Sequence, residues 1–481
     1  MPAMRRTAFE DLREWADADL HRPLIVRGAR QVGKTWLVEA FAREHLGDVA
    51  TVNVERLREM RSLFADPSPR ANVAAIEALL GKRIVPGRCL LFFDEIQAWP
   101  ELLARLRYFH EEIPELHVVA AGSLLDFALA DHISSMPVGR ISYLHLGPMS
   151  FPEFVTAIAG ERTTQFLHTV RLRQAPPVPI HDKLMALMRD YSLVGGMPAV
   201  VESFRTSRSL VAAARVQQDL LATFRDDFSR YGTRIPAARL QRVLDSIARQ
   251  IGGKFMWTAV DREERAQALR QALEALCRAR VCHLVRCSHG NGIPLGADLV
   301  EKQFKVAMVD TGLVQSSLGL LLRAGAAPGE LTNEGPLAEH LVGQLLADLS
   351  PRFVEPALWY WSRHQHGAEA EVDYLLQHGT EVVPIEVKAG STGTLRSLHR
   401  FVVEKQARLA VRVSIAPPQL ATVTANVPGH APHDFQLLSI PFYLVPELPR
   451  LIDEARTSKT KAPKRSRAQT AARSKPRKRG R

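Results

Sequence analysis

The sequence has 481 residues, of which 46% are hydrophobic and 24% are charged, and its formal net charge is +12. A chain of this length exceeds one hydrophobic core, so we expect two to four domains. The composition is typical of a soluble globular protein, and no run approaches the roughly 18 apolar residues of a membrane span, so an integral membrane protein is not expected.

The N-terminus and the cysteines indicate the expected compartment. Acidic residues stand in the first 20 positions, where a signal peptide would carry its apolar core. The four cysteines form no CxxC pair and suit neither a zinc knuckle nor a disulfide framework. Buried thiols in a reducing cytosol are therefore expected, and the predicted location is cytoplasmic.

The first 150 residues alternate between apolar runs and helical patterns. Strands are predicted at Pro23–Val26, Val49–Val54, Cys89–Glu95 and His117–Ser123, and helices at Lys34–His45 and Glu101–Glu112. Strands that alternate with helices predict a parallel sheet with helices on both faces.

A glycine-rich loop lies between the first predicted strand and its helix. Its sequence, GARQVGKT, fits the pattern G-x-x-x-x-G-K-[ST] at every position. Such a loop turns backbone N–H groups toward phosphate oxygens, while the lysine reaches the β- and γ-phosphates and the last hydroxyl binds Mg²⁺. We therefore expect ATP and Mg²⁺ as cofactors, held by Gly28, Ala29, Arg30, Gln31, Val32, Gly33, Lys34 and Thr35.

Four further polar residues complete the predicted nucleotide site. Asp94 follows four apolar residues and is expected to hold the metal from a neighbouring strand tip, while Glu95 activates the attacking water. Ser123 ends the next strand and would sense the γ-phosphate. Arg140 would bring positive charge to a phosphate, in cis or from a neighbouring subunit, with a structural salt bridge as the alternative.

From about Ser150 the pattern becomes helical. Helices are predicted at Ala237–Ile251 and from Glu264 onward, and the second runs into a strand, a turn and a further strand at Glu301–Asp310. Helices followed by a two-stranded turn favour a winged helix.

The stretch EVDYLLQHGTEVVPIEVKAG, Glu371–Gly390, carries a second chemical signal. Residues two apart in a strand share a face, so Glu386 and Lys388 point together, and so do Glu371 and Asp373 on the preceding strand. A hairpin would bring Asp373 close to Glu386.

An upstream helix supplies another acid to this region. Glu339 borders the apolar stripe of that helix. Glu339, Asp373 and Glu386 would hold a divalent metal beside a phosphodiester, and Lys388 would orient or help to deprotonate the attacking water. The alternative is a charged sheet edge, and Pro384 is unusual for a central strand.

The excess of basic charge lies at the end of the chain. The 26 residues from Arg456 contain twelve Lys or Arg and no Asp or Glu, which leaves 51 basic and 51 acidic residues in the remainder. Such a segment is typical of a disordered tail that contacts nucleic-acid phosphates without reading sequence, or of a solubilising extension.

Several motifs together resemble one family. RPLIVRGARQVGKT, LLFFDEIQ, PVGRISYLHLGPMSFPEF, YSLVGGMPAVV, KQFKVAMVDTGL and the stretch Glu371–Gly390 resemble the prokaryotic AAA-type ATPases that carry a C-terminal domain of unknown function numbered 4143. The resemblance implies an AAA+ or STAND-like ATPase core, a winged-helix segment and a restriction-endonuclease-like end of the PD-(D/E)xK kind. The basic tail is not part of this pattern.

The predicted fold class is α/β, with four segments. They are a P-loop parallel-sheet ATPase domain over residues 1–155, a helical lid and winged-helix-like domain over 156–330, a PD-(D/E)xK nuclease-like domain over 331–446, and a disordered basic tail over 456–481.

The predicted function is an ATP-hydrolysing AAA-type ATPase that couples nucleotide state to a C-terminal module. That module would engage DNA or RNA together with the tail, and cleavage is left open. The alternative is a STAND-like regulatory ATPase whose nuclease-like domain binds without cutting. A homo-oligomer is left open, and no membrane partner is expected.

Overall fold

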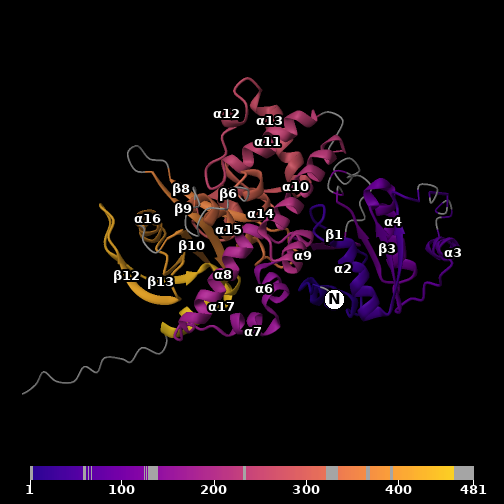
Figure 1. Ribbon diagram of the computed structural model, residues 1–481, viewed down its shortest axis with the longest axis horizontal. Helices are drawn as coiled ribbons and strands as arrows, with labels where there is room; N and C mark the ends of the chain where they lie inside the picture. The colour runs from indigo at the N-terminus through magenta and orange to yellow at the C-terminus, as the bar shows by residue number, and fades with distance from the viewer. Residues whose placement is uncertain are drawn as a thin grey trace, which may run out of the picture.

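The computed structural model describes residues 4–57, 61, 62, 64, 66, 68–123, 125, 127, 139–230, 235–320, 334–363, 369–390 and 394–459. These residues form an N-terminal parallel sheet and a larger C-terminal mixed sheet, with a group of helices between them (Figure 1).

The N-terminal sheet has five parallel strands in the order β2-β3-β4-β1-β5. This arrangement confirms the predicted α/β core with a parallel sheet. One detail differs from the prediction, because β4 lies between β1 and β3, so the strand that ends in Asp94 is not the direct neighbour of the strand before the loop. The strands are β1 (Leu24–Arg27), β2 (Asp48–Asn53), β3 (Cys89–Asp94), β4 (Val118–Ala121) and β5 (Ser142–His145).

Helices cover both faces of this sheet, because alternate strand residues are apolar on each side. Phe93 packs with helices α3 (Pro69–Leu80) and α4 (Glu101–Glu112) in one core cluster. Phe92 points the other way, toward helices α1 (Ala8–Ala16) and α2 (Lys34–Phe41). Short helical turns follow at η1 (Ala42–Leu46) and η3 (Ile96–Ala98).

A helical region follows the first sheet. Its segments are α6 (Phe151–Ala159), α7 (Glu161–Thr169), α8 (Val178–Val194), α9 (Pro198–Ser207), α10 (Leu210–Asp226), η5 (Asp227–Arg230), α11 (Ala237–Arg249), α12 (Trp257–Val260), α13 (Ala266–Arg278) and α14 (Thr311–Ser317). The turn between α8 and α9 needs a glycine at Gly196, since a Cβ there would lie 2.1 Å from the carbonyl oxygen of Met149. The backbone of the helical region therefore packs directly against the backbone at Met149, shortly after the end of β5.

The C-terminal sheet has eight strands in the order β12-β13-β11-β10-β9-β8-β6-β7. Strands β6 (Cys282–Ser288) and β7 (Leu299–Met308), with the turn η6 (Leu295–Asp298) between them, form the predicted antiparallel hairpin. However, β6 also pairs in parallel with β8 (Leu358–Arg363). The predicted boundary at residue 330 therefore cuts a continuous sheet, and the structure does not confirm a separate winged-helix domain.

The remaining strands are β9 (Ala370–His378), β10 (Glu381–Val387), β11 (Leu409–Ser414), β12 (Gln419–Ala425) and β13 (His433–Pro441). Strands β9 and β10 form the predicted hairpin, and β10 lies inside the sheet. Pro384 is tolerated there because the pairing of β10 with β11 begins one residue later, at Ile385.

Three helices complete the C-terminal half. Helix α15 (Glu334–Ala347) packs against β7, β8 and β10, and α16 (Arg396–Lys405) packs against β9. The turn η8 (Phe442–Glu447) leads to α17 (Leu448–Lys459). The predicted tail boundary at Arg456 falls inside α17, where Arg456 donates a hydrogen bond to Glu381 at 2.8 Å. Residues 460–481, which hold the rest of the predicted tail, lie outside the described residues.

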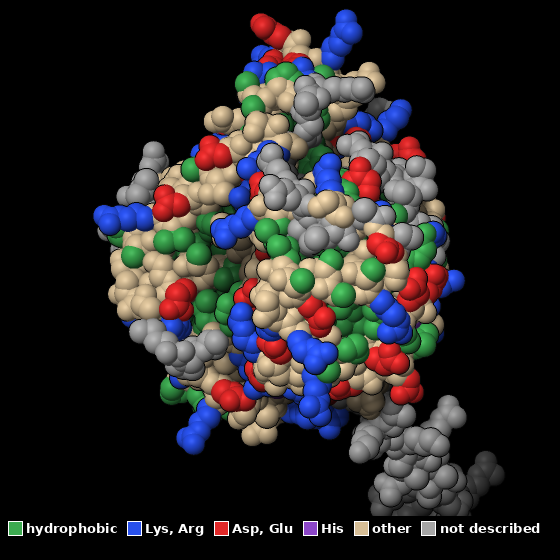
Figure 2. All heavy atoms as spheres, turned by 90° about the vertical axis from the view of Figure 1, so that its right-hand side faces the viewer, with side chains coloured by type: hydrophobic (Ala, Val, Ile, Leu, Met, Phe, Trp, Pro, Cys, Tyr) green, Lys and Arg blue, Asp and Glu red, His purple; other side chains and the backbone are tan. Residues whose placement is uncertain are grey.

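One core cluster crosses the boundaries of the predicted segments, because its buried apolar side chains run from β1 and α2 through the helices to β10 and β11. Two further clusters lie against α3 and α4 in the N-terminal half and around α16 in the C-terminal half. On the face over the N-terminal sheet, acidic and basic side chains are intermixed (Figure 2). None of the helices in the described ranges combines the length and the apolar character needed to cross a bilayer.

Candidate functional site

The glycine-rich loop connects the end of β1 to the start of α2, as predicted. A Cβ on Gly28 would lie 2.2 Å from the backbone oxygen of Leu146, so only glycine fits this close approach. Gly33 has a left-handed φ of 92° and precedes Lys34, the first residue of α2. The two glycines thus shape the loop and place it at the positive end of a helix.

Lys34 is buried and turned back onto its own loop. Its Nζ atom donates hydrogen bonds to the carbonyl oxygens of Gly28 at 2.9 Å and Ala29 at 2.8 Å. Burial lowers the pKa of Lys34 to about 8, although the charges of Glu95 and Asp94 act in the opposite direction. Within the part of the chain that the structure describes, no carboxylate forms an ion pair with Lys34, and its hydrogen bonds go to neutral carbonyl oxygens.

Thr35 and Asp94 meet across the site. The Thr35 hydroxyl lies 3.1 Å and 3.3 Å from the two carboxylate oxygens of Asp94. Burial, followed by the nearby charge of Glu95, raises the pKa of the Asp94 carboxyl. Two oxygen ligands suited to Mg²⁺ therefore lie next to each other at the start of α2. They do so although β4 lies between β1, which precedes the loop, and β3, which ends in Asp94.

Glu95 and Ser123 occupy the adjacent strand ends. Glu95 has a left-handed φ of 54°, and the Gln97 side-chain amide donates to its Oε2 atom at 2.5 Å. Ser123 is buried just after β4. A Cβ on Gly122 would lie 2.0 Å from Oε1 of Gln97, so Gln97 fills the space between the two strand ends. Sequence reasoning missed Gln97, whose only signal was its place two residues after Glu95.

Arg140 does not lie at this site. It precedes β5, which runs parallel to β1, whereas the loop follows the other end of β1. Its guanidinium pairs with Glu111 at 2.5 Å, near the end of α4. The structure thus shows the salt bridge that the sequence left as the alternative, and a contact with the nucleotide of a neighbouring subunit stays a prediction.

A different arginine links the loop to the helical region. Arg30 donates from Nη1 to both carboxylate oxygens of Asp227, at 2.5 Å and 2.6 Å. Asp227 directly follows α10 and is nearly fully buried. Arg30 was predicted as a cofactor-binding residue, and in this structure its charge is engaged by a carboxylate.

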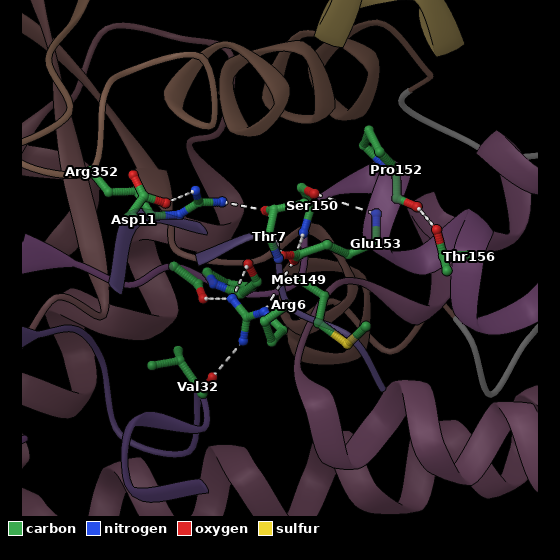
Figure 3. Close-up of polar contacts among 12 residues, drawn as sticks. Arg6, Thr7, Asp11, Val32, Met149, Ser150, Pro152, Glu153, Thr156 and Arg352 are labelled. Carbon is green, nitrogen blue, oxygen red and sulfur yellow. Dashed lines mark hydrogen bonds and ion pairs between the residues drawn. The ribbon is translucent and has the colours of Figure 1, made fainter. Parts of the chain in front are cut away.

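Arg6 forms a second link beneath the loop (Figure 3). Its guanidinium bonds the Val32 carbonyl oxygen at 2.9 Å, the Gly147 carbonyl oxygen at 2.9 Å and the Glu153 carboxylate at 3.1 Å. Glu153 also caps α6 together with Ser150. Burial alone would raise the pKa of Glu153, but Arg6 and these hydrogen bonds outweigh it, so the pKa lies below its usual value.

The same group extends to the C-terminal half. The Thr7 hydroxyl donates to Glu153 at 2.8 Å and accepts from Arg352 at 2.5 Å, as Figure 3 shows. Arg352 also pairs with Asp11 at 2.6 Å. A continuous chain of hydrogen bonds therefore joins the phosphate loop, through Arg6 and Glu153, to the residues between α15 and β8.

The C-terminal residues predicted to share a site do come together. The Asp373 carboxylate accepts the Val387 N–H at 2.7 Å across the β9–β10 hairpin, and Lys388 donates to Glu386 at 2.7 Å. The charge of Asp373 raises the pKa values of both Glu339 and Glu386, after burial as the larger cause.

Sequence reasoning missed one member of this cluster. Lys305, on β7, is almost fully buried and pairs with Glu339 at 2.7 Å and with Glu371 at 2.6 Å. These partners raise its pKa well above the usual value, although burial alone would lower it. Alternation in a strand places Lys305 between the apolar neighbours Phe304 and Val306, and a lysine within an apolar strand segment was the available signal.

The cluster does not have the form of the predicted metal site. Among the described residues, no group of three or more His, Cys, Asp or Glu side chains is arranged to hold a metal ion. Burial raises the pKa of Glu339 to about 8 and that of Glu386 to about 7. Glu339, Glu371, Asp373 and Glu386 are instead grouped around Lys305 and Lys388.

Comparison with known families gives three matches along the chain. The AAA domain matches residues 20–155, a domain of unknown function numbered 8612 matches residues 185–323, and the domain of unknown function numbered 4143 matches residues 334–421. Comparison with curated proteins gives no match.

Solved structures resemble the chain only distantly. The Walker-type ATPase PABY2304 of Pyrococcus abyssi is 16% identical with a TM-score of 0.43, covering 66% of this chain and 96% of its own. The ORC2 protein of Aeropyrum pernix, in ADPNP–ADP complexes, is 14% identical with a TM-score of 0.34, covering 68% of this chain and 97% of its own. TM-scores in this range do not establish a common fold for the whole chain.

The family matches agree with the geometry of both regions. The AAA match spans the parallel sheet, the phosphate loop and the Thr35–Asp94 contact. The match to domain 4143 begins at α15 and spans the carboxylate cluster around Lys388. The chain therefore combines an AAA domain with a C-terminal domain of unknown function 4143, the combination that the resemblance of its motifs implied.

Proposed function

We propose that this chain binds ATP together with Mg²⁺ at the phosphate loop and hydrolyses it. The observation that carries the proposal is the contact of the Thr35 hydroxyl with both Asp94 oxygens, at 3.1 Å and 3.3 Å, beside the buried Lys34. A buried cation without a carboxylate partner is stabilised by an anionic ligand such as a phosphate. When bound, Mg²⁺ would neutralise charge on the phosphates.

The other polar residues take distinct roles in this proposal. Glu95 accepts a proton from the attacking water, and Gln97 holds the Glu95 carboxylate in place through its 2.5 Å hydrogen bond. Ser123 contributes a hydroxyl near the γ-phosphate from the end of β4.

The proposed test is ATP hydrolysis by the full-length protein, measured with Mg²⁺ and after its removal by EDTA. We expect turnover only with Mg²⁺, because the Thr35 and Asp94 oxygens hold the nucleotide through the ion. Equal turnover in EDTA, or none under any condition, would contradict the assignment.

We also propose that nucleotide state is coupled to the C-terminal half. Two links that begin at the loop support this proposal. The first joins Arg30 to Asp227 in the helical region. The second runs from the Val32 carbonyl oxygen through Arg6 and Glu153 to Thr7, which contacts Arg352. Any movement of the loop around phosphates changes these links, because both start from residues 30–32.

The proposed partner of the C-terminal module is DNA or RNA, bound through the basic sequence after α17. Residues 460–481 contain ten Lys or Arg and no acidic residue. Ending the chain at Lys459 leaves α17 and the Arg456–Glu381 pair intact. The truncated chain should bind nucleic acid with a flatter salt dependence, by up to about 0.9 in the log–log slope for each phosphate that the tail no longer neutralises. An unchanged slope would remove the tail from the proposal.

Of the two functions considered for the C-terminal domain, binding without cutting is favoured. The specific observation is the ion pair of Lys305 with Glu339, one of the three carboxylates of the predicted metal site, and with the neighbouring Glu371. This arrangement supports a regulatory ATPase with a non-cleaving module.

A further inference from the structure

The carboxylate cluster already contains a cation. The Lys305 ammonium lies 2.7 Å from Glu339 Oε1 and 2.6 Å from Glu371 Oε1, and its side chain is only 3% exposed. It also lies 5.0 Å from the centre of the Tyr360 ring, on whose face a cation is attracted. Two carboxylates and an aromatic face therefore surround this ammonium group.

The other carboxylates of the cluster have donors within the chain as well. Asp373 Oδ2 accepts the Val387 N–H at 2.7 Å, and Glu386 Oε1 accepts from Lys388 at 2.7 Å. Glu386 Oε2 is buried and has no hydrogen-bond partner in the described residues. Mg²⁺ is usually held by one or two carboxylates together with several waters, and here the Lys305 ammonium occupies the space between the Glu339 and Glu371 carboxylates that such an ion would need.

Lysines also lie among the acids of the cluster. Lys305 and Lys388 face Glu339, Glu371, Asp373 and Glu386, and Lys254 lies 3.7 Å from Glu371 Oε2. Three lysines therefore offset most of the charge of four carboxylates, so the repulsion between the acids, which favoured a metal in the sequence-based prediction, is largely relieved by side chains of the chain itself.

We propose that Lys305 is the resident cation of this cluster, taking the place of a divalent metal, so that the domain neither binds Mg²⁺ there nor cleaves phosphodiesters. This deepens the non-cleaving role proposed for the C-terminal domain and does not depend on ATP hydrolysis, because the cluster lies on a different sheet from the phosphate loop. It also assigns a role to the β6–β7 hairpin, which joins the C-terminal sheet and delivers Lys305 to α15 and β9.

The test is Mn²⁺ binding to the nucleotide-free full-length protein, followed by electron paramagnetic resonance, with Mn²⁺ as the probe for Mg²⁺. Wild type and Glu339→Gln should give the same binding curve, because the cluster holds no metal. Lys305→Met should gain one site with a dissociation constant of about 10⁻⁴ to 10⁻³ M, as for weak oxygen-ligand sites. The double change Lys305→Met, Glu339→Gln should lose that site again.

A matched control is available on the same strand. Lys302 is exposed, so Lys302→Met removes one lysine from β7 without touching the cluster and should gain no site. The proposal is overturned if wild type binds a Mn²⁺ ion that Glu339→Gln removes, or if folded Lys305→Met gains none. If Lys305→Met fails to fold, the Mn²⁺ binding curves of wild type and Glu339→Gln still test whether the cluster holds a metal ion. Metal-dependent cleavage that disappears in Glu386→Ala would also overturn it.

Discussion

Lys34 and Lys305 are both buried lysines beside acidic residues, but their ammonium groups have different partners. Lys34 donates to two neutral carbonyl oxygens, and burial lowers its pKa to about 8. Lys305 pairs with two carboxylates, which hold its pKa well above the usual value. The first lysine has a charge available for an anionic ligand, whereas the second is already neutralised within the protein.

The difference teaches that residue type alone does not define a ligand site. Each region combines a lysine with two or more carboxylates on strands or helix ends, which is the composition of many phosphate and metal sites. The partners that the fold places around each lysine decide whether a ligand is needed, because a buried charge must be compensated by one source or another. Substitutions at Lys34, Glu95, Lys305 and Arg140 test this contrast.

Replacing Lys34 with Ala should abolish ATP binding or turnover. The loop would lose its only lysine, whose ammonium is the positive group placed to hold the β- and γ-phosphates, so both binding and turnover depend on it. Nucleotide binding by calorimetry and phosphate release would measure it, with the exposed Lys302→Met as control. A Lys34→Ala protein that binds and hydrolyses ATP like wild type would refute the assignment of the loop.

Replacing Glu95 with Gln should leave ATP bound and slow hydrolysis by about 10²–10⁴, the usual range for a lost general base. Binding persists because the loop, Thr35 and Asp94 are unchanged. The exposed residue Glu112 offers a control of the same chemistry on α4. Single-turnover kinetics would separate the two effects, and a rate equal to wild type would show that Glu95 is not the base.

Replacing Lys305 with Met should destabilise the protein by about 3–5 kcal/mol, because the buried acids lose their cation. The exposed Lys302→Met should stay within about 0.5 kcal/mol of wild type. The destabilisation should grow as pH rises from about 5 to about 8. The folded-state pKa values of Glu339 (about 8) and Glu386 (about 7) are raised, so the folded protein binds these two protons more tightly than the unfolded chain does. The free energy of unfolding therefore falls as the two carboxyl groups lose their protons with rising pH.

Chemical denaturation of both variants across this pH range is the measurement. A Lys305→Met protein as stable as wild type, or one that gains stability toward high pH, would contradict the role of Lys305.

Replacing Arg140 with Ala should change ATP turnover by less than about twofold, because its partner is the exposed Glu111 and surface ion pairs contribute about 0–1 kcal/mol. Turnover should be measured at several protein concentrations. A large loss of activity that depends on concentration would indicate that Arg140 reaches the nucleotide of a neighbouring subunit.

The parts of the site that the sequence predicted are those set by local pattern. The loop from Gly28 to Thr35 and the pairing of Asp373 with β10 depend on turn geometry and on the two-residue period of strands. The position of β4 between β1 and β3 could not be predicted this way, because strand order is decided by packing across the whole sheet. The choice between a salt bridge and a phosphate contact for Arg140 likewise needed the structure, because it depends on where the start of β5 lies relative to α4.

Lys305 shows the same limit at the second site. It lies 34 residues before Glu339 in sequence, and their pairing depends on the parallel arrangement of β6 with β8. No local pattern indicates that arrangement, so the hairpin was assigned to a separate domain. The predicted tail boundary at Arg456 was placed by basic composition alone. The helix α17 continues to Lys459, because its buried apolar residues hold it against the C-terminal half. These residues are Leu448, Leu451, Ile452 and Ala455.

The most direct test of the contrast is to count the Mn²⁺ ions bound per full-length chain, by electron paramagnetic resonance, with and without ATP. We expect one additional bound ion that appears only with ATP, is lost in Lys34→Ala and is kept in Glu339→Gln. An ion that binds without ATP and disappears in Glu339→Gln, or no ion when ATP is present, would contradict it.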